Sequence, residues 1–241
     1  MAPPIHLSPA AELAERVLLP GDPQRALRMA QDLLDAPRMF NTRRGLWGYT
    51  GTTPAGLTVT IQSTGMGGPS AAIVVEELIE LGVRVLVRTG TCGALDGAHD
   101  LGALVAATEV IGADGASRAL GTGERLRADP ALSEALVANG AQPVTAVSTD
   151  LFYDPRPGIE DEWRRSGANV IEMEAAAVLA AAAGHGARAA CLLLVSDVLS
   201  GDRRARIDQE ELESRELALG ELALAALSAD AAATAGRKQR Q

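Results

Sequence analysis

Two glutamates, Glu172 and Glu174, stand two residues apart around Met173, just before an almost purely apolar segment. Side chains at positions i and i+2 share a face of an extended strand but not of a helix. The two carboxylates can therefore converge only if the chain is extended at Glu172 and the helix begins at about Glu174. Two fixed acceptors there would suit adjacent hydroxyls, as on a sugar. The simpler interpretation is a negative charge that only stabilises the N-terminus of the helix.

Arginine and glycine residues recur where expected strands end. Gly21 follows the first expected strand, and Arg25 lies in the first turn of the next helix. Helix N-termini bind anions, and a guanidinium matches the oxygens of phosphate. Arg88 ends a buried strand, and ligands bind in α/β sheets at the carboxyl ends of strands. An ordinary turn at Gly21 and a structural carboxylate partner for Arg88 are the alternatives.

The elements that must position these residues alternate along the chain. Strands are expected at 16–19, 57–62, 83–87, 104–110, 144–148 and 190–195, and helices at 24–34, 71–81, 130–139, 159–166 and 208–233. This alternation predicts an α/β protein, which we expect to be a single domain over residues 1–241. Residues 112–128 are polar and glycine-rich, which favours an exposed loop, and we expect residues 236–241 to be a disordered tail.

The composition limits the possible partners. The chain is 47% hydrophobic but only 2% aromatic, so the core must be aliphatic, and the net charge is −9. An acidic balance argues against nucleic acid and against a membrane surface as partners. A local group of arginines must therefore bind any anionic ligand.

Cysteine usage and hydropathy suggest a cytoplasmic protein. Cys92 and Cys191 are far apart in apolar runs and are expected to be reduced core residues. No pair has metal-ligand spacing, so we expect no metal site. No basic and apolar leader precedes the fold, and no apolar run reaches about 18 residues, so we expect neither a signal peptide nor a membrane span.

Seven short motifs in one order carry a family resemblance. They are Leu19-Pro20-Gly21-Asp22-Pro23 with Arg25, Arg44-Gly45, Gly65-Met66-Gly67 with Pro69-Ser70, Arg88-Thr89-Gly90-Thr91-Cys92-Gly93-Ala94, Asp150-Leu151-Phe152-Tyr153, Glu172-Met173-Glu174-Ala175-Ala176 and Ser196-Asp197. Together they resemble the nucleoside phosphorylase-I family, which includes hexameric purine nucleoside phosphorylases and uridine phosphorylases. The resemblance implies a single-domain three-layer α/β/α fold with a central mixed β-sheet.

The family's reaction is reversible phosphorolysis, in which phosphate attacks the anomeric carbon of a nucleoside while the base departs. The resemblance implies no cofactor, with inorganic phosphate as co-substrate, and a homo-oligomer, a hexamer built from dimers that share active sites. It assigns phosphate binding to Gly21, Arg25, Arg88, Thr89, Gly90 and Thr91, with Arg44 supplied by a neighbouring subunit. It assigns nucleoside binding to His6, Phe152, Glu172, Met173, Glu174 and Ser196, with His6 reaching a neighbour's 5′ hydroxyl. His6 alone would be interpreted as a solvated terminal group, and Phe152 with Tyr153 as a core anchor.

Asp197 bears on the choice of base. It matches the aspartate with which purine phosphorylases protonate N7, and desolvation at the end of a buried strand would raise its pKa. The purine branch has a further arginine, which assists this aspartate, at the position of Glu210 here. Arg203, Arg204, Arg206 and Arg215 are possible substitutes, and the apolar pattern of the last helix favours Arg215.

Two signals conflict over the substrate. Residues 63–70 look more like the uridine branch, whereas Asp197 and the short run from Phe152 to Glu172 favour purines. We therefore expect a purine nucleoside phosphorylase. The alternatives are a uridine phosphorylase, a methylthioadenosine phosphorylase, a nucleosidase that uses water, and a non-catalytic nucleoside-binding protein. Arg25, Arg44 and Arg88 are suited to phosphate and disfavour water as the nucleophile. The presence of Asp197 and of both glutamates weighs against a non-catalytic protein.

Overall fold

The structure is a computed structural model that describes residues 4–200 and 203–238. Its strands are β1 (Arg16–Leu19), β2 (Asp35–Asn41), β3 (Gly48–Thr52), β4 (Thr58–Gln62), β5 (Val85–Ala94), β6 (Leu104–Gly112), β7 (Arg125–Arg127), β8 (Gln142–Ser148), β9 (Val170–Glu172), β10 (Arg188–Ser200) and β11 (Arg203–Arg206). Its helices are α1 (Pro23–Leu33), α2 (Gly68–Glu80), α3 (Gly115–Ala119), α4 (Pro130–Ala138), α5 (Ile159–Arg165), α6 (Ala175–Gly184) and α7 (Gln209–Lys238), with a 3₁₀ turn at Arg43–Gly45.

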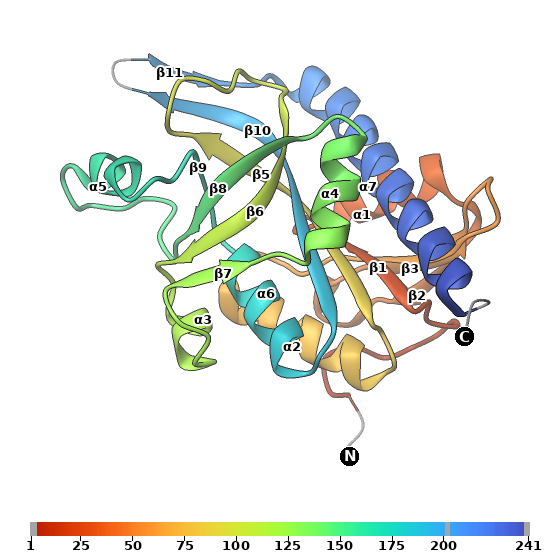
Figure 1. Cartoon of the computed structure of the whole chain (residues 1–241). Coiled ribbons are helices and arrows are strands. Elements are labelled where there is room, and N and C mark those ends of the chain that lie inside the picture. Colours follow the sequence, from red (N-terminus) through yellow and green to blue (C-terminus); the bar gives the residue numbers. More distant parts are fainter. Residues whose placement is uncertain (1–3, 201–202, 239–241) are drawn as a thin grey trace.

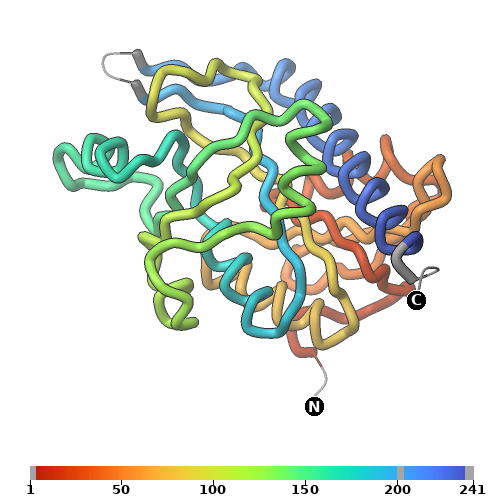
Figure 2. Tube along the Cα trace, in the orientation of Figure 1, coloured from red at the N-terminus to blue at the C-terminus, as the bar shows by residue number. Residues whose placement is uncertain are grey.

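The described strands form one mixed sheet in the order β11-β10-β6-β8-β9-β5-β1-β4-β3-β2, with β7 beside β6. Parallel pairs such as β1 with β5 and antiparallel pairs such as β3 with β4 occur in the same sheet. Strand β10 also pairs with β5, so strands β5, β9, β8, β6 and β10 close into a ring. Figure 2 traces β10 in blue through the middle of the molecule beside β5 in yellow.

Two groups of helices cover the sheet (Figure 1). Helix α7 packs on α1 and α4, and α6 packs on α2 and α3. The core between the layers is aliphatic, as the composition predicts, and Phe40 is the one aromatic residue among its largest fully buried side chains in the described chain. The predicted α/β class and mixed sheet are confirmed.

Several local predictions are wrong. Strands β2 and β3 were not predicted, and β5 continues beyond Val87 to Ala94 because Thr89 to Ala94 pair with β10. The expected loop at 112–128 contains α3 and β7, and its Asp114 is fully buried where it caps α3 by accepting from the Ser117 N–H at 2.7 Å.

Helix α7 differs from its prediction in two ways. It extends to Lys238, so residues 236–238 of the expected tail are helical, while residues 239–241 lie outside the described chain. Contrary to expectation, α7 is also long and apolar enough, by length and composition alone, to cross a membrane. Its apolar face is nevertheless part of the core, where Leu219, Ala223 and Leu227 are buried. A core helix passes the same hydropathy test, and its packing on α1 and α4 favours that interpretation.

The packing of α7 predicts unequal effects of two similar substitutions. Leu219 is fully buried, whereas Leu217 on the same helix is 37% exposed. Leu219→Ala should lower the free energy of unfolding by about 2–5 kcal/mol, because it removes a buried side chain and leaves a cavity. Leu217→Ala, the matched control, should cost less than half as much. Denaturant unfolding of both variants measures this, and equal costs would contradict the placement of α7.

Candidate active site

Loops after two neighbouring parallel strands meet beside the start of α6. The Thr64 N–H donates to the Pro20 carbonyl at 2.9 Å, and the Gly65 N–H donates to the Gly21 carbonyl at 3.0 Å. A Cβ on Gly21 would lie 3.3 Å from the Gly65 carbonyl oxygen, so the two loops are in close backbone contact. Gly67, at φ +88°, then donates its N–H to Glu174 Oε1 at 2.6 Å. Glycine is suited to this left-handed conformation.

Arg88 lies at the centre of this group and is 3% exposed. Its Nε donates to Glu172 Oε2 at 2.9 Å, and its Nη2 donates to Glu174 Oε2. Burial alone would lower the pKa of Arg88, but the charges of Glu174 and Glu172 outweigh burial and raise it. The third nitrogen, Nη1, is buried without a hydrogen-bond partner. Buried donors are nearly always paired, so this nitrogen needs a partner from outside the described chain, either water or a ligand.

Glu172 holds both Arg88 and the start of α6. Besides Arg88, its carboxylate accepts from the backbone N–H groups of Glu174 and Ala175, each at 2.9 Å, and from Ser148 Oγ. The chain is extended at Glu172 in β9, and Glu174 is the N-cap of α6, as predicted. Because Glu172 is fully occupied inside the protein, Glu174 is the better placed of the two to accept from sugar hydroxyls.

Burial raises the pKa of Glu174, and the positive charges of Arg88 and Arg25 act in the opposite direction. Arg25 lies in the first turn of α1, directly after the loop of Gly21 that contacts Gly65. Arg25 is 7% exposed, and its Nε donates to Glu216 Oε1 of α7 at 2.7 Å. The loop of residues 64–67 thus joins Gly21 to Glu174, and Glu174 binds Arg88. The phosphate-binding roles of Gly21, Arg25 and Arg88 stay predictions.

Gly90 allows the Arg88 side chain to adopt its observed position. A Cβ on Gly90 would lie 2.6 Å from Arg88 Nη2 and 2.8 Å from Arg88 Cζ, so any larger residue would displace the guanidinium. Thr89 is fully buried and its Oγ1 has no hydrogen-bond partner, while Thr91 and Met173 are partly buried. The ligand-binding roles of Thr89, Gly90, Thr91 and Met173 stay predictions.

Two predicted site residues lie near the surface. Arg44 is exposed in the 3₁₀ turn, at φ 58°, and nothing joins it to Arg88 within the described chain. His6 is held by Glu77 of α2, whose Oε1 lies 2.7 Å from His6 Nδ1. Glu77 also accepts from the N–H groups of Ile5, His6 and Leu7 at 2.7–3.0 Å. The predicted contacts of Arg44 and His6 with a neighbouring subunit stay predictions.

Asp197 is partly buried, and its surroundings differ from expectation. Strand β10 continues past it to Ser200, so Asp197 does not end the strand. Its Oδ2 accepts from Ser196 Oγ at 2.7 Å, and its Oδ1 lies 3.7 Å from Arg206 Nε across the β10–β11 pair. Arg215, the favoured assistant, instead donates from Nε to the Gly102 carbonyl at 2.9 Å. In the described chain Arg206, not Arg215, is therefore the arginine that pairs with Asp197.

Phe152 and Tyr153 are exposed rather than core residues. Phe152 is 61% exposed, and its ring contacts that of Tyr153 edge to face at 5.0 Å between centroids. The alternative that this pair anchors the core is therefore wrong. A role for Phe152 against a base stays a prediction.

Both cysteines are free and buried, as expected, and burial raises the pKa of each thiol. Across residues 4–200 and 203–238, no group of three or more histidine, cysteine, aspartate or glutamate side chains is arranged to hold a metal ion. The expectation that the protein uses no metal stays a prediction.

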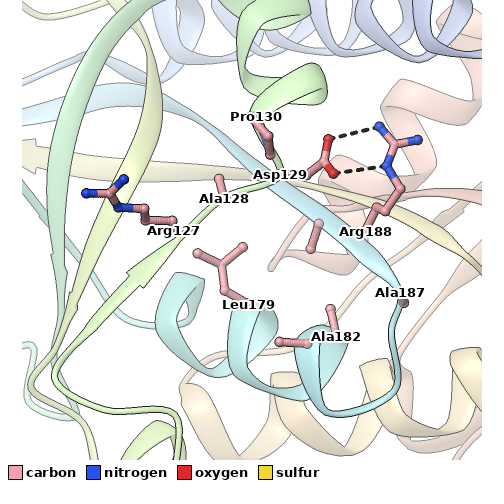
Figure 3. A pocket seen from close by; sticks show the side chains of 10 residues that line it. Arg127, Ala128, Asp129, Pro130, Leu179, Ala182, Ala187 and Arg188 are labelled. Carbon is pink, nitrogen blue, oxygen red and sulfur yellow. Dashed lines mark hydrogen bonds and ion pairs between the residues drawn. The ribbon is translucent and has the colours of Figure 1, made fainter. Parts of the chain in front are cut away.

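A cavity of about 290 Å³ lies away from these residues, between α4, α6 and β10 (Figure 3). Its lining includes Arg127, Leu179, Ala182 and Ala187, and the ion pair of Asp129 with Arg188 closes one side. None of the predicted site residues lines it.

Comparison with known proteins identifies the family. The model of the phosphorylase superfamily matches residues 15–229. The chain belongs to the phosphorylase superfamily. A purine nucleoside phosphorylase DeoD-type of Geobacillus kaustophilus is 35% identical over 236 residues, which cover 93% of this chain and 97% of that protein. Another, from a Jannaschia species, is 37% identical over 234 residues, covering 92% and 98%. A third, DeoD-type 2 of Aliivibrio fischeri, is 35% identical and covers 88% and 93%.

Several residues that build the site were not predicted from the sequence. Ser148 donates to Glu172 and accepts from the Ala176 N–H at 2.9 Å, and its position at the end of an expected strand was the only signal for it. Glu77 and Glu216 fix His6 and Arg25 from distant helices. Nothing in the local sequence distinguishes these two glutamates from surface charges.

The anchoring of His6 predicts a pH-dependent contribution to stability. Burial alone would raise the pKa of Glu77, but hydrogen bonds from His6, Leu7 and Ile5 outweigh it and hold the pKa below its ordinary value of 4.5. A carboxylate of this kind stabilises the fold fully above its ordinary pKa and loses that contribution as the pH falls through its native-state pKa. Glu77→Gln should therefore cost at least about 1.5 kcal/mol at pH 7.

The difference between wild type and Glu77→Gln should shrink as the pH falls below 4.5. Denaturant unfolding across that range measures it, with Glu80→Gln, at an exposed position of the same helix, as the control. A difference that does not vary with pH would contradict the role given to Glu77.

Proposed function

We propose that this protein is a purine nucleoside phosphorylase, which cleaves purine ribonucleosides and deoxyribonucleosides with phosphate to give the base and a pentose 1-phosphate. The observation that carries the proposal is the buried, unpaired Nη1 of Arg88. It belongs to a guanidinium that two carboxylates hold in place. A second buried arginine, Arg25, acts electrostatically on one of these carboxylates, Glu174. The names and identities of the relatives support the same reaction.

The reaction needs a phosphate-binding site, acceptors for the sugar hydroxyls and a proton donor for the base. Phosphate is bound by Arg88 and Arg25, with the loop at Gly21 and the segment 89–91 closing around it. Glu174 accepts from the ribose hydroxyls, and Met173 packs against the sugar. As the glycosidic bond breaks, positive charge develops on the sugar beside Glu174 and negative charge develops on the base. Electrostatic stabilisation of such charges is usually the largest contribution to catalysis.

Asp197 protonates the departing purine at N7, and Ser196 orients it through the hydrogen bond to Oδ2. Proton donation of this kind contributes about 10²–10⁴ in rate. The proposal favours a purine over uridine because a carboxylic acid can supply this proton. Arg206 takes the place next to Asp197 that the sequence alone had favoured for Arg215.

The charges of the site support an oligomer. Arg25, Arg28 and Arg88 are balanced by Glu172, Glu174 and Glu216. A phosphate dianion added to this balanced group needs a further cation, and the exposed Arg44 of a neighbouring subunit would supply it. We therefore propose a homo-oligomer, a hexamer of dimers that share active sites, in the cytoplasm. The proposal includes no cofactor beyond phosphate.

Phosphorolysis of inosine tests the proposal. The wild-type protein should release hypoxanthine in the presence of orthophosphate, and release should stop when phosphate is omitted. Arg88→Lys should lower kcat/KM by about tenfold to a hundredfold, since a charge-assisted hydrogen bond contributes about 1.5–3 kcal/mol. Arg127→Lys, at a side chain that is 86% exposed, is the matched control and should change little.

The outcomes separate the alternatives. Release of base without phosphate would indicate a nucleosidase. Turnover of uridine or methylthioadenosine in place of inosine and adenosine would indicate the other phosphorylases. No turnover of any nucleoside would overturn the proposal.

The role of Asp197 predicts a substrate-dependent effect. Asp197→Asn should lose adenosine cleavage by about 10²–10⁴ and inosine cleavage by less, because adenine is the poorer leaving group without N7 protonation. Steady-state kinetics on both substrates measure this, with Asp161→Asn, at a side chain that is 65% exposed, as the control. Equal losses on both substrates would count against proton donation by Asp197.

A further inference from the structure

A single carboxylate of α7 binds two arginines of α1. Glu216 is 3% exposed, and its Oε1 accepts from Arg25 Nε at 2.7 Å. Its Oε2 accepts from Arg28 Nη2 at 2.5 Å. Residues 25 and 216 are far apart in the sequence, and the contact exists only because α7 packs against α1 (Figure 1).

The contact determines which edge of the Arg25 guanidinium is available. Glu216 occupies Nε, and Arg25 Nη1 and Nη2 have no partner among residues 4–200 and 203–238. The loop before α1 is in backbone contact with the loop after β4, where the Gly65 N–H donates to the Gly21 carbonyl at 3.0 Å. Gly67 of that second loop binds Glu174, which itself binds Arg88. Arg25 thus lies on the element next to the Arg88 group, and its two terminal nitrogens are free to contact a ligand.

Both oxygens of the Glu216 carboxylate are needed to hold Arg25 in this orientation. A buried arginine has many rotamers, and a charge-assisted bond to each carboxylate oxygen restricts them. Arg28 holds Oε2, so that Oε1 stays directed toward Arg25. Asp22, the N-cap of α1, lies 4.0 Å from Arg28 Nη2 and completes the link between the loop after β1 and α7.

We propose that Glu216 is a positioning residue for the phosphate subsite, which holds Arg25 by Nε so that its two terminal nitrogens face the attacking phosphate. This inference rests on the proposed function and extends it to α7. It means that the packing of the last helix on α1 determines phosphate affinity, although no residue of α7 touches phosphate.

The test shortens the side chain of residue 216 while keeping its negative charge. Glu216→Asp keeps the negative charge but is one methylene shorter, so it cannot bind Arg25 and Arg28 in the same way. The KM for phosphate should rise about tenfold or more, as when the partner that orients a metal ligand is lost. The KM for inosine and the kcat at saturating phosphate should stay close to wild type. Titration calorimetry with orthophosphate alone should show the same loss of affinity without any dependence on turnover.

Asp230→Asn is the control for the loss of a buried ion pair elsewhere on α7. Asp230 is also buried on α7, where it binds Arg188 at 2.7 Å and lies 3.7 Å from Arg16, and neither arginine is part of the proposed subsite. This variant should lower stability but leave the phosphate KM unchanged. A rise in phosphate KM for both variants would mean that any loss of α7 packing has this effect, and would overturn the specific role of Glu216.

A second variant separates positioning from charge. Glu216→Gln keeps the length but can accept from only one of the two arginines, so phosphate binding should again weaken. Tighter phosphate binding by this variant would show that Glu216 acts only as a repelling charge and would overturn the inference. Unchanged phosphate affinity in Glu216→Asp would also overturn it. If wild type binds phosphate but turns over no nucleoside, the proposed reaction fails while the calorimetric comparison still decides the role of Glu216.

Discussion

The site depends on one buried charge, the guanidinium of Arg88. A charge removed from water is costly unless it is paired and its other hydrogen-bonding groups are satisfied. Here Glu172 and Glu174 supply the pairing from one short segment, and Ser148 and the backbone at the start of α6 hold Glu172 in turn. The remaining nitrogen is unpaired. The protein thus contributes a rigid cation with one open direction, which is what recognition of an oxyanion requires.

The topology explains how such a group can be rigid. Arg88 lies within β5, which is bordered by β1 and by β10, while β9 ends in Glu172. Arg88 is flanked by β1 and β10, and Asp197 by β5 and β11. Strand β9, which carries Glu172, pairs with β5 and β8, so backbone hydrogen bonds hold each of these strands on both sides. Functional side chains on strands of this kind are positioned more accurately than on loops. Arg25 lies on a helix instead, and Glu216 of α7 restrains it.

Much of this arrangement could be predicted from the sequence, and the failures have physical causes. The helix start after Glu172 and the position of Arg88 follow from local periodicity and from apolar runs, which are local properties. Strands β2 and β3 were missed because their partners, not their composition, make them strands. The extensions of β5 and β10 were missed because glycine and polar residues there are extended only through pairing with each other. Asp197 was expected at a strand end, and Arg206 became its partner through the register of β11.

By itself the sequence determined the α/β class, the aliphatic core, the family resemblance and the set of residues suited to phosphate and sugar, because these follow from residue type, spacing and order. Only the tertiary structure decided which carboxylate holds which arginine: Glu172 and Glu174 on Arg88, Glu216 on Arg25 and Glu77 on His6. Each of these pairs joins residues at least 71 positions apart in the chain. An ion pair depends on the distance between two side chains in space, and the sequence around either residue does not reveal its partner.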